Sequence, residues 1–259
     1  MAKTFYETMG KAQEYAPIAL ELYESCQHSC AYCYNTTKPK KYQKKAETFF
    51  TEGKPISGIV EAVEKKAFEF ERYIDPKMRR RVLMCFGSDP YQEAERKFEV
   101  TRRVLEILDR NKVPFQVLTK NPALALRDLD VFKRAGGHLA TTVLFLDEAL
   151  RDKWEPGAPK PLDRLYAMKV AHENGVYTWA SVEPVVDPVE ALKVIERASP
   201  YIDLWKVGRL NYVEGANDID WKKFAFDVVK LLKSLNKNYI IKKDLAVFLP
   251  DNIPARNVP

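Results

Sequence analysis

The sequence lacks any long apolar run, and it has few of the glycines and prolines that interrupt secondary structure. No stretch approaches the roughly 18 apolar residues of a membrane-spanning helix, and the first residues lack the apolar core of a secretory signal. The 10 glycines and 16 prolines among 259 residues are too few for a low-complexity chain. Hydrophobic residues make up 46%, enough to bury a sizeable core. We therefore expect one large, globular, cytoplasmic domain with no membrane partner.

Charge of one sign is in only small excess. The 42 lysines and arginines outweigh the 36 acidic residues to give a net charge of +6. Such a chain allows a polyanionic partner without requiring one. The basic runs at 38–45, 77–81 and 242–244 are short, and a short run is most often a solvated face. The run at 38–45 is the more suggestive one, because it directly follows a cysteine-rich loop.

Cysteine is scarce, but three of the four cysteines lie within eight residues. Cys26, Cys30 and Cys33 have the spacing C-x3-C-x2-C. Disulfides are not expected in a chain without a secretory signal, so the group indicates a metal. Three thiolates can bind three irons of a 4Fe–4S cluster and leave the fourth iron open. The open iron suits S-adenosylmethionine, whose cleavage yields a 5′-deoxyadenosyl radical.

A zinc site and a chance group of buried thiols are the alternatives for this loop. Structural zinc needs four ligands, usually in two pairs. His28 lies inside the loop, where it can hardly reach the same ion as the cysteines. Cys85 is distant in sequence but could approach in space. The spacing favours an iron–sulfur cluster over zinc, and zinc over chance.

Short apolar segments alternate with amphipathic ones along most of the chain. Strands are expected at 18–24, 82–87, 115–119, 139–146, 176–184 and 203–208. Helices are expected at about 56–75, 94–111, 121–136, 161–173, 188–198 and 219–235, and 239–243 is either a terminal strand or a closing segment. Six ordered strand–helix repeats predict parallel strands and right-handed crossovers, and they are too few for the eight-unit barrel.

The predicted fold is therefore α/β, a partial (β/α)6 TIM-like barrel with parallel strands. The barrel would span 18–243, after an N-terminal extension at 1–17 and before a C-terminal tail at 244–259. Active sites of such barrels lie at the C-terminal ends of the strands. The cysteine loop, 87–89, 119–120, the loop after 146 and 183–184 all fall there.

Four blocks of the sequence carry a family resemblance. They are CQHSCAYCY at 26–34, SDPYQEAE at 88–95, LTKNPALALRDLDVF at 118–132 and TTVLFLDEALRDKWEPGAPKPLDRL at 141–165. In this order they resemble the radical S-adenosylmethionine (SAM) superfamily, and more narrowly the spore photoproduct lyase and DNA-repair photolyase-like group. Ser29 stands where the group often has Gly, and Ser88 where Thr is common.

The resemblance implies a role for each matching residue. The cluster ligands would be Cys26, Cys30 and Cys33. Contacts to SAM would come from Tyr32, Tyr34 (near the adenine), Ser88 and Asp89 (amino group or ribose), Lys120 (carboxylate) and Thr142 (ribose). Lysine is a compact cation suited to a carboxylate, and hydroxyl groups suit a ribose. Cys85 is a candidate hydrogen-atom donor to a product radical, although a small buried hydrophobic residue is the more ordinary interpretation.

The resemblance also implies an enzyme that abstracts hydrogen from a nucleic acid base or nucleotide, in repair or modification. An external electron donor such as flavodoxin or ferredoxin would supply the electron. The alternatives are a radical enzyme acting on a peptide or small metabolite, and a non-catalytic metal-binding module. Glu155 and Arg164 could pair and fix the loop after the fourth strand, or one of them could contact the cofactor. Glu183 and Lys206 are candidates for the substrate side.

Overall fold

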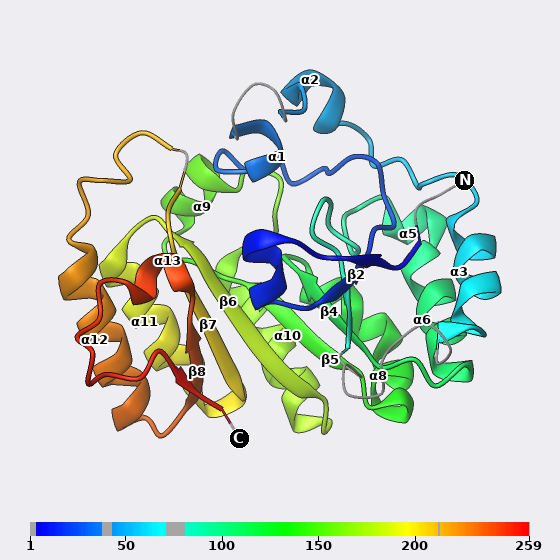
Figure 1. The fold of residues 1–259 in the computed structure, drawn as a ribbon. Coiled ribbons are helices and arrows are strands. Elements are labelled where there is room, and N and C mark those ends of the chain that lie inside the picture. Colours follow the sequence, from blue (N-terminus) through cyan, green and yellow to red (C-terminus); the bar gives the residue numbers. More distant parts are fainter. Residues whose placement is uncertain (1–3, 38–42, 71–80, 212, 259) are drawn as a thin grey trace.

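One curved sheet organises the protein, with its strands in sequence order (Figure 1). The computed structural model describes residues 4–37, 43–70, 81–211 and 213–258. The parallel strands are β2 (Ile18–Leu20), β3 (Val82–Met84), β4 (Phe115–Thr119), β5 (His138–Thr142), β6 (Tyr177–Val185), β7 (Leu204–Arg209) and β8 (Asn238–Ile241). Two short strands, β1 (Tyr6–Glu7) and β9 (Arg256–Asn257), pair antiparallel at the edges. The predicted α/β class with parallel strands is confirmed, and β8 is the terminal strand that follows the six repeats.

Helices cover the convex side of the sheet and the loops at its C-terminal edge (Figure 1). The longer ones are α3 (Ile59–Ala67), α6 (Val100–Arg110), α8 (Leu129–Ala135), α9 (Glu148–Trp154), α10 (Pro161–Glu173), α11 (Pro188–Ala198) and α12 (Trp221–Ser234). The short ones are α1 (Tyr34–Thr37), α2 (Ala46–Phe49), α5 (Glu95–Phe98), α7 (Pro122–Ala125) and α13 (Lys243–Ala246), with 3-10 turns η1 (Gly10–Glu14), η4 (Leu126–Asp128) and η5 (Ser199–Tyr201).

Local sequence signals explain where several helices begin and end. Asp187 caps α11, because its carboxylate accepts hydrogen bonds from the backbone of Val189 and Glu190, and Pro188 occupies the first helical position. Gly136 ends α8 in the left-handed conformation, at φ 60°. The bounds of α10 and α11 agree with the helices expected at 161–173 and 188–198.

Other expected elements differ from the structure. The helix expected at 94–111 is divided into α5 and α6 by Glu99, whose φ of 47° breaks the helical path. The helix expected at 121–136 is likewise divided into α7, η4 and α8. The strand expected at 139–146 ends at Thr142, and α9 forms in a segment that was expected to be a loop. Residues 71–75 of the first expected helix, 38–42 of the first basic run and 77–80 of the second lie outside the described residues.

Two apolar cores support the sheet. The larger one lies between the sheet and its helices, and it includes Val117, Leu139 and Trp205. The smaller one lies among the inward-facing residues of the barrel, with Trp179 and Leu83 at its centre. Hydrophobic burial on both faces is what stabilises a parallel sheet.

The N-terminal segment 4–17 crosses the concave side of the sheet, where η1 lies in front of the strands (Figure 1). The carbonyl of Tyr15 accepts hydrogen bonds from Gln116 on β4 and Lys206 on β7, both at 3.2 Å. Lys11 forms an ion pair of 2.7 Å with Asp244 on α13. The segment thus contacts strands far from β2, the strand with which β1 pairs, and it forms one wall of the barrel interior.

Candidate active site

A cavity of about 900 Å³ opens at the C-terminal ends of the parallel strands. The predicted cluster, cofactor and hydrogen-donor residues all line it: Cys26, Cys30, Cys33, Tyr32, Tyr34, Cys85, Ser88, Asp89, Lys120 and Thr142. These residues come from the loops after β2, β3 and β4 and from β5. Parallel strands bring their C-terminal ends to one edge, and this places residues more than a hundred positions apart around one space. Of the two residues expected on the substrate side, Glu183 lines the cavity and Lys206 does not.

The three loop cysteines follow β2 and face this cavity. Cys30 is buried, and Cys26 and Cys33 are partly buried. Burial raises the pKa of Cys26 to about 12 and raises the pKa of the Cys30 and Cys33 thiols as well. Within the described residues no three His, Cys, Asp or Glu side chains converge on a point that could hold one metal ion. A cluster does not need such a point, because each thiolate binds a different iron, so the donor set fits a cluster better than zinc.

The block after β3 fastens the cysteine loop from one side. The backbone N–H of Gln27 donates to Gln92 Oε1 at 2.9 Å, and Gln92 Nε2 donates to the carbonyl of Ser25 at 3.0 Å. In return, Gln27 Oε1 accepts from the backbone of Ala94 at 2.6 Å. Three hydrogen bonds therefore fix the backbone on both sides of Cys26.

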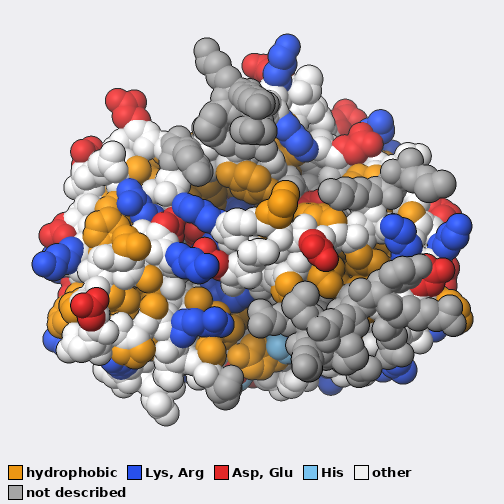
Figure 2. Space-filling view, viewed as in Figure 1, with side chains coloured by type: hydrophobic (Ala, Val, Ile, Leu, Met, Phe, Trp, Pro, Cys, Tyr) orange, Lys and Arg blue, Asp and Glu red, His pale blue; other side chains and the backbone are white. Residues whose placement is uncertain are grey.

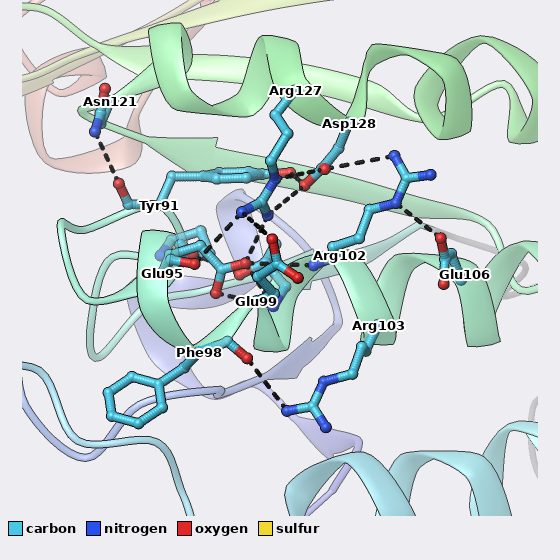
Figure 3. A network of polar contacts seen from close by, with 12 residues as sticks. Tyr91, Glu95, Phe98, Glu99, Arg102, Arg103, Glu106, Asn121, Arg127 and Asp128 are labelled. Atoms are coloured by element: carbon cyan, nitrogen blue, oxygen red, sulfur yellow. Dashed lines mark hydrogen bonds and ion pairs between the residues drawn. The ribbon is translucent and has the colours of Figure 1, made fainter.

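A buried ionic network holds that block in place (Figure 3). The fully buried Glu95 accepts from Arg127 Nη2 at 2.8 Å, and Arg127 also pairs with Asp128. The hydroxyl of Tyr91 donates to Asp128 at 2.9 Å, while its carbonyl accepts from Asn121 at 3.0 Å. The segments at 88–95 and 118–132 thus form one unit beneath the cysteine loop, although neither Glu95 nor Arg127 reaches the cavity lining.

The loop after α9 fastens the cysteine loop from the other side. Glu155 and Arg164 are fully buried and form an ion pair of 2.5 Å, so the expected pairing is confirmed. Tyr32 of the cysteine loop donates its hydroxyl hydrogen to Glu155, and Arg164 donates to the carbonyl of Thr142 at 3.1 Å. Burial would raise the pKa of Glu155, but the charges of Arg164 and Lys120 outweigh it and lower that pKa.

Gly157 lies against the backbone of the cysteine loop. Its N–H donates to the carbonyl of His28 at 3.0 Å, and a Cβ at this position would lie 2.3 Å from the carbonyl oxygen of Gln27. Only glycine allows this approach without a shift of the loop. The Gly of the EPGAP sequence therefore serves the contact with the cysteine loop.

Asp89 joins three elements of the site. Its Oδ1 accepts from the backbone of Tyr91 at 2.8 Å and from Thr119 Oγ1 at 2.6 Å. Its Oδ2 accepts from the backbone of Lys120 at 2.7 Å and lies 3.1 Å from His28 Nε2. Burial would raise the pKa of Asp89, but His28 and these hydrogen bonds hold it at about 2. Both oxygens are thus occupied by protein donors.

His28 is held by oxygens on both ring nitrogens. Nδ1 lies 3.0 Å from the carbonyl of Gly157, and Nε2 faces Asp89. A histidine fixed in this way links the blocks around the loop and has no nitrogen turned toward the cysteines. The zinc alternative therefore loses its nearest fourth ligand.

Two groups beside the cysteines have unused hydrogen-bonding capacity. Among the described residues no carboxylate lies within ion-pair distance of Lys120, whose Nζ is 5.5 Å from the centroid of the Tyr32 ring. Burial would lower the pKa of Lys120, but Cys30, Glu155 and Asp89 outweigh it and raise that pKa, so the cation persists. Ser88 Oγ is buried and has no hydrogen-bond partner in the described structure. An unpaired cation and an unsatisfied hydroxyl fit a ligand that carries a carboxylate.

Cys85 is the fourth cysteine and lies apart from the loop, at the end of β3. It is 4% exposed and lines the cavity. Burial and the nearby Glu21 carboxylate raise the pKa of its thiol well above the ordinary value. The sulfur therefore remains a neutral thiol with its hydrogen in place.

The far wall of the cavity contains residues that sequence reasoning missed. Tyr15 donates to Glu183 Oε2 at 2.5 Å and lies 2.7 Å from Ser181 Oγ, and Lys242 Nζ lies 2.6 Å from the same carboxylate oxygen of Glu183. Glu183 lines the cavity, as expected. No sequence signal marks Tyr15, because its partners are more than 160 residues away.

Lys206 lies beneath this wall. It is 4% exposed, and its Nζ is 4.2 Å from the centroid of the Trp179 ring. Burial, with the charges of Lys242 and Arg256, lowers the pKa of Lys206 to about 7. It supports the wall from the barrel interior, where aromatic rings replace part of its hydration.

A family comparison agrees with this geometry. The model of the radical SAM superfamily matches residues 20–198, which is more than half of the chain. The matched region begins within β2 and contains the cysteine loop and all ten residues predicted for the cluster, the cofactor and hydrogen donation.

Solved structures with the same fold include two radical SAM enzymes. Spore photoproduct lyase superposes with a TM-score of 0.63 at 13% identity, over 82% of this chain and 62% of its own. SuiB of Streptococcus suis, solved with S-adenosylmethionine, gives 0.62 at 14% identity, over 90% of this chain and 52% of its own. At these identities the likeness shows the fold, a partial TIM barrel, and this chain spans about half to two thirds of each neighbour's length.

Relatives by sequence are uncharacterized proteins. One from Methanocaldococcus jannaschii is 26% identical over 252 residues, which covers 90% of this chain and 89% of the relative. One from Acidianus two-tailed virus is 25% identical over 254 residues, covering 90% and 80%. Among the described residues, no helix combines the length and apolar character needed to cross a bilayer.

Proposed function

The chain belongs to the radical SAM superfamily, whose members use a 4Fe–4S cluster and S-adenosylmethionine, and on this basis we propose a hydrogen-abstracting enzyme that acts on a nucleic acid base or nucleotide. The observation that carries the proposal is the shared cavity. Three thiols, an unpaired lysine and an unsatisfied serine hydroxyl face the same space at the C-terminal edge of the barrel. This combination suits a cluster next to an amino acid-bearing cofactor.

We assign the cluster to Cys26, Cys30 and Cys33. When bound, the cluster and S-adenosylmethionine supply a 5′-deoxyadenosyl radical that abstracts a hydrogen atom from the substrate. The three thiols must release their protons to solvent to bind iron as thiolates, and the raised pKa values make cluster loading depend on pH. The two fastening blocks hold the loop open toward the cavity during this step.

The remaining cavity residues would position S-adenosylmethionine. Lys120 is the cation for its carboxylate, because no described carboxylate neutralises this lysine. Ser88 and Thr142 offer hydroxyl groups, and Tyr32 and Tyr34 offer ring faces beside the loop. Asp89 was expected to contact the cofactor, but it accepts three hydrogen bonds from the protein and faces His28 Nε2, and this favours a positioning role, in which it holds His28 and Lys120 in place.

Cys85 is suited to return a hydrogen atom to a product radical. It faces the cavity from β3, and its raised pKa keeps the sulfur–hydrogen bond intact at neutral pH. This role is compatible with a lyase or with a base-modifying enzyme. An external reductant such as flavodoxin or ferredoxin would supply the electron that starts each cycle.

The nucleic acid assignment rests on charge and on one neighbour. Spore photoproduct lyase has been solved with a dinucleoside spore photoproduct, and this chain carries a net charge of +6. A peptide is the second candidate, because SuiB has been solved with its precursor peptide SuiA.

The first test is anaerobic reconstitution with iron and sulfide, reduction with dithionite and an assay for 5′-deoxyadenosine. We expect the protein to bind a cluster and form 5′-deoxyadenosine. The triple Cys26→Ala, Cys30→Ala, Cys33→Ala variant should do neither, while Cys85→Ala, the matched control, should keep its iron. A protein that binds zinc and never cleaves the cofactor would contradict the proposal.

The substrate class is tested by binding at graded salt concentrations. Phosphate contacts make affinity fall steeply as salt rises. Absence of binding to single-stranded DNA or RNA at low salt, with 5′-deoxyadenosine formed in the presence of a peptide, would replace the nucleic acid by the peptide.

A further inference from the structure

Arg209 is a cation at the far wall of the cavity, and no carboxylate of the described residues forms an ion pair with it. It ends β7, and its side chain lines the cavity that also contains the cysteines. Within the described part of the chain, the only side-chain acceptor it reaches is the amide oxygen of Asn217, at 3.3 Å from Nη2. Its Nε is buried and has no hydrogen-bond partner there. A buried donor without a partner costs free energy unless a ligand completes it.

Aromatic rings hold the guanidinium in place. Its central carbon lies 5.2 Å from the centroid of the Trp221 ring and 5.6 Å from that of Phe248. Cation–π contacts of this kind restrain the guanidinium while leaving its N–H groups free to donate. Arg209 is therefore oriented before any ligand arrives.

The neighbouring charges do not neutralise Arg209. Lys242 already pairs with Glu183 at 2.6 Å, and Lys11 already pairs with Asp244 at 2.7 Å. Asn211 adds an amide to the same wall, and its Nδ2 donates to Asp244. Among the described residues, Glu183 and Asp244 on this wall are each paired with a lysine, and neither forms an ion pair with Arg209.

The surface outside this wall is also basic. Lys and Arg side chains gather over β7, β8 and α13, with acidic side chains among them (Figure 2). Lys11, Lys243 and Arg256 are exposed. A ligand with several phosphates would meet further cations beyond the cavity, whereas a ligand with one carboxylate would not use them.

We propose that Arg209 binds a phosphate of the substrate and thereby places the neighbouring nucleoside between the far wall and the cysteine loop. This inference rests on the proposed function and adds the residue that would recognise the substrate through its phosphate. A planar guanidinium gives two parallel hydrogen bonds to phosphate oxygens, and Arg209 has the donors for them. The cysteine loop follows β2 and Arg209 ends β7, so the two lie on different sides of one cavity.

The test compares two probes that differ in one charge. The probes are the dinucleotide dT-phosphate-dT and its methylphosphonate analogue, which is neutral and nearly the same shape. Binding is measured by calorimetry at 50 mM and 200 mM salt on the reconstituted protein. Wild type should bind the charged dinucleotide about 10- to 100-fold more tightly, and Arg209→Gln should lose this preference.

Two further variants keep the result interpretable. Arg103→Gln removes an arginine whose described contact is the carbonyl of Phe98, far from the cavity, and should keep the preference. Arg209→Lys should retain part of it, since the charge stays and the paired donors are lost. Unchanged affinity of Arg209→Gln for the neutral analogue would show that the wall still folds.

Three outcomes would overturn the inference. They are equal affinity of wild type for the two probes, an unchanged preference in Arg209→Gln, and tighter binding of an acidic peptide that Arg209→Gln abolishes. The last outcome would assign Arg209 to a carboxylate. Phosphate discrimination with no cleavage of S-adenosylmethionine would instead refute the proposed function alone, so the two failures are distinguishable.

Discussion

Glu155→Gln tests whether the buried ion pair between Glu155 and Arg164 contributes to the stability of the fold. Glu155 and Arg164 are both fully buried and lie 2.5 Å apart. The substitution removes the negative charge beside the buried Arg164, which still donates to the carbonyls of Pro159 and Thr142. Removing one partner of a buried pair typically costs about 3–5 kcal/mol. Each kcal/mol lowers the Tm of a domain of this size by about 2–4 °C, so we expect a fall of at least about 6 °C.

The matched control is Glu148→Gln in the preceding helix. Glu148 pairs with Lys160 at 2.8 Å, but these side chains are about half exposed, at 50% and 54%. An exposed pair is worth about 0–1 kcal/mol, so this variant should unfold within a few degrees of wild type. The two pairs have similar lengths and differ in burial, and burial is what the comparison isolates.

The assay is urea unfolding of Glu155→Gln and Glu148→Gln, and of Glu155→Met, Arg164→Met and the variant that combines these two Met substitutions, together with iron content after reconstitution. The variant with both Met substitutions should be more stable than either single Met variant, because no buried charge is left unpaired. In Glu155→Gln the acceptor for the Tyr32 hydroxyl changes from a charged carboxylate to a neutral amide oxygen, which weakens this hydrogen bond, so iron content should fall as well. Equal stability of Glu155→Gln and Glu148→Gln, or purely additive effects in the double variant, would refute this reasoning.

Four further changes test other parts of the site. Because burial lowers the pKa of Lys206 to about 7, the unfolded chain binds one proton more than the folded chain between about pH 7 and pH 10, and the free energy of unfolding therefore rises with pH in this range. Lys206→Met should remove about 2 kcal/mol of the rise in this free energy that urea unfolding measures between pH 7.5 and 9.5. Lys222→Met, at an exposed site, should leave the rise unchanged. Gly157→Ala should displace the cysteine loop and lower iron content, and full loading would contradict the close contact. Ser29 adopts a φ of 51°, so Ser29→Gly should load normally while the β-branched Ser29→Val should lower the Tm; equal Tm values would show that the backbone relaxes. Cys85→Ala should keep its cluster, but its product should contain less solvent-derived deuterium than the wild-type product when the reaction is run in deuterated buffer and analysed by mass spectrometry. Unchanged deuterium incorporation would show that Cys85 is not the hydrogen donor.

The sequence by itself determined the fold class and the cofactor side of the site. Alternating apolar and amphipathic segments predicted the strand–helix repeats, because their periodicity is a property of neighbouring residues. The C-x3-C-x2-C spacing predicted three thiols on one loop, and strand ends predicted which residues would join them. Ten predicted site residues do line one cavity.

Local pattern was a poorer guide to element ends. Glu99 breaks an amphipathic stretch that reads as one helix, and Thr142 ends a strand whose apolar run continues to Leu146. In both places tertiary contacts decide where the helix or strand ends. Glu95 pairs with Arg127 in the buried network, and the backbone N–H groups of Leu146 and Asp147 donate to the Glu190 carboxylate.

Only the tertiary structure decided the far wall of the cavity and the use of Asp89. Tyr15 meets Ser181 across 166 residues of chain, and Lys11 meets Asp244 across 233, because the N-terminal segment crosses the concave side of the sheet. No spacing in the sequence encodes such contacts, since they depend on the curvature of the whole barrel. The same holds for Arg209: that no described carboxylate pairs with it follows only from the positions of the neighbouring charges in the fold.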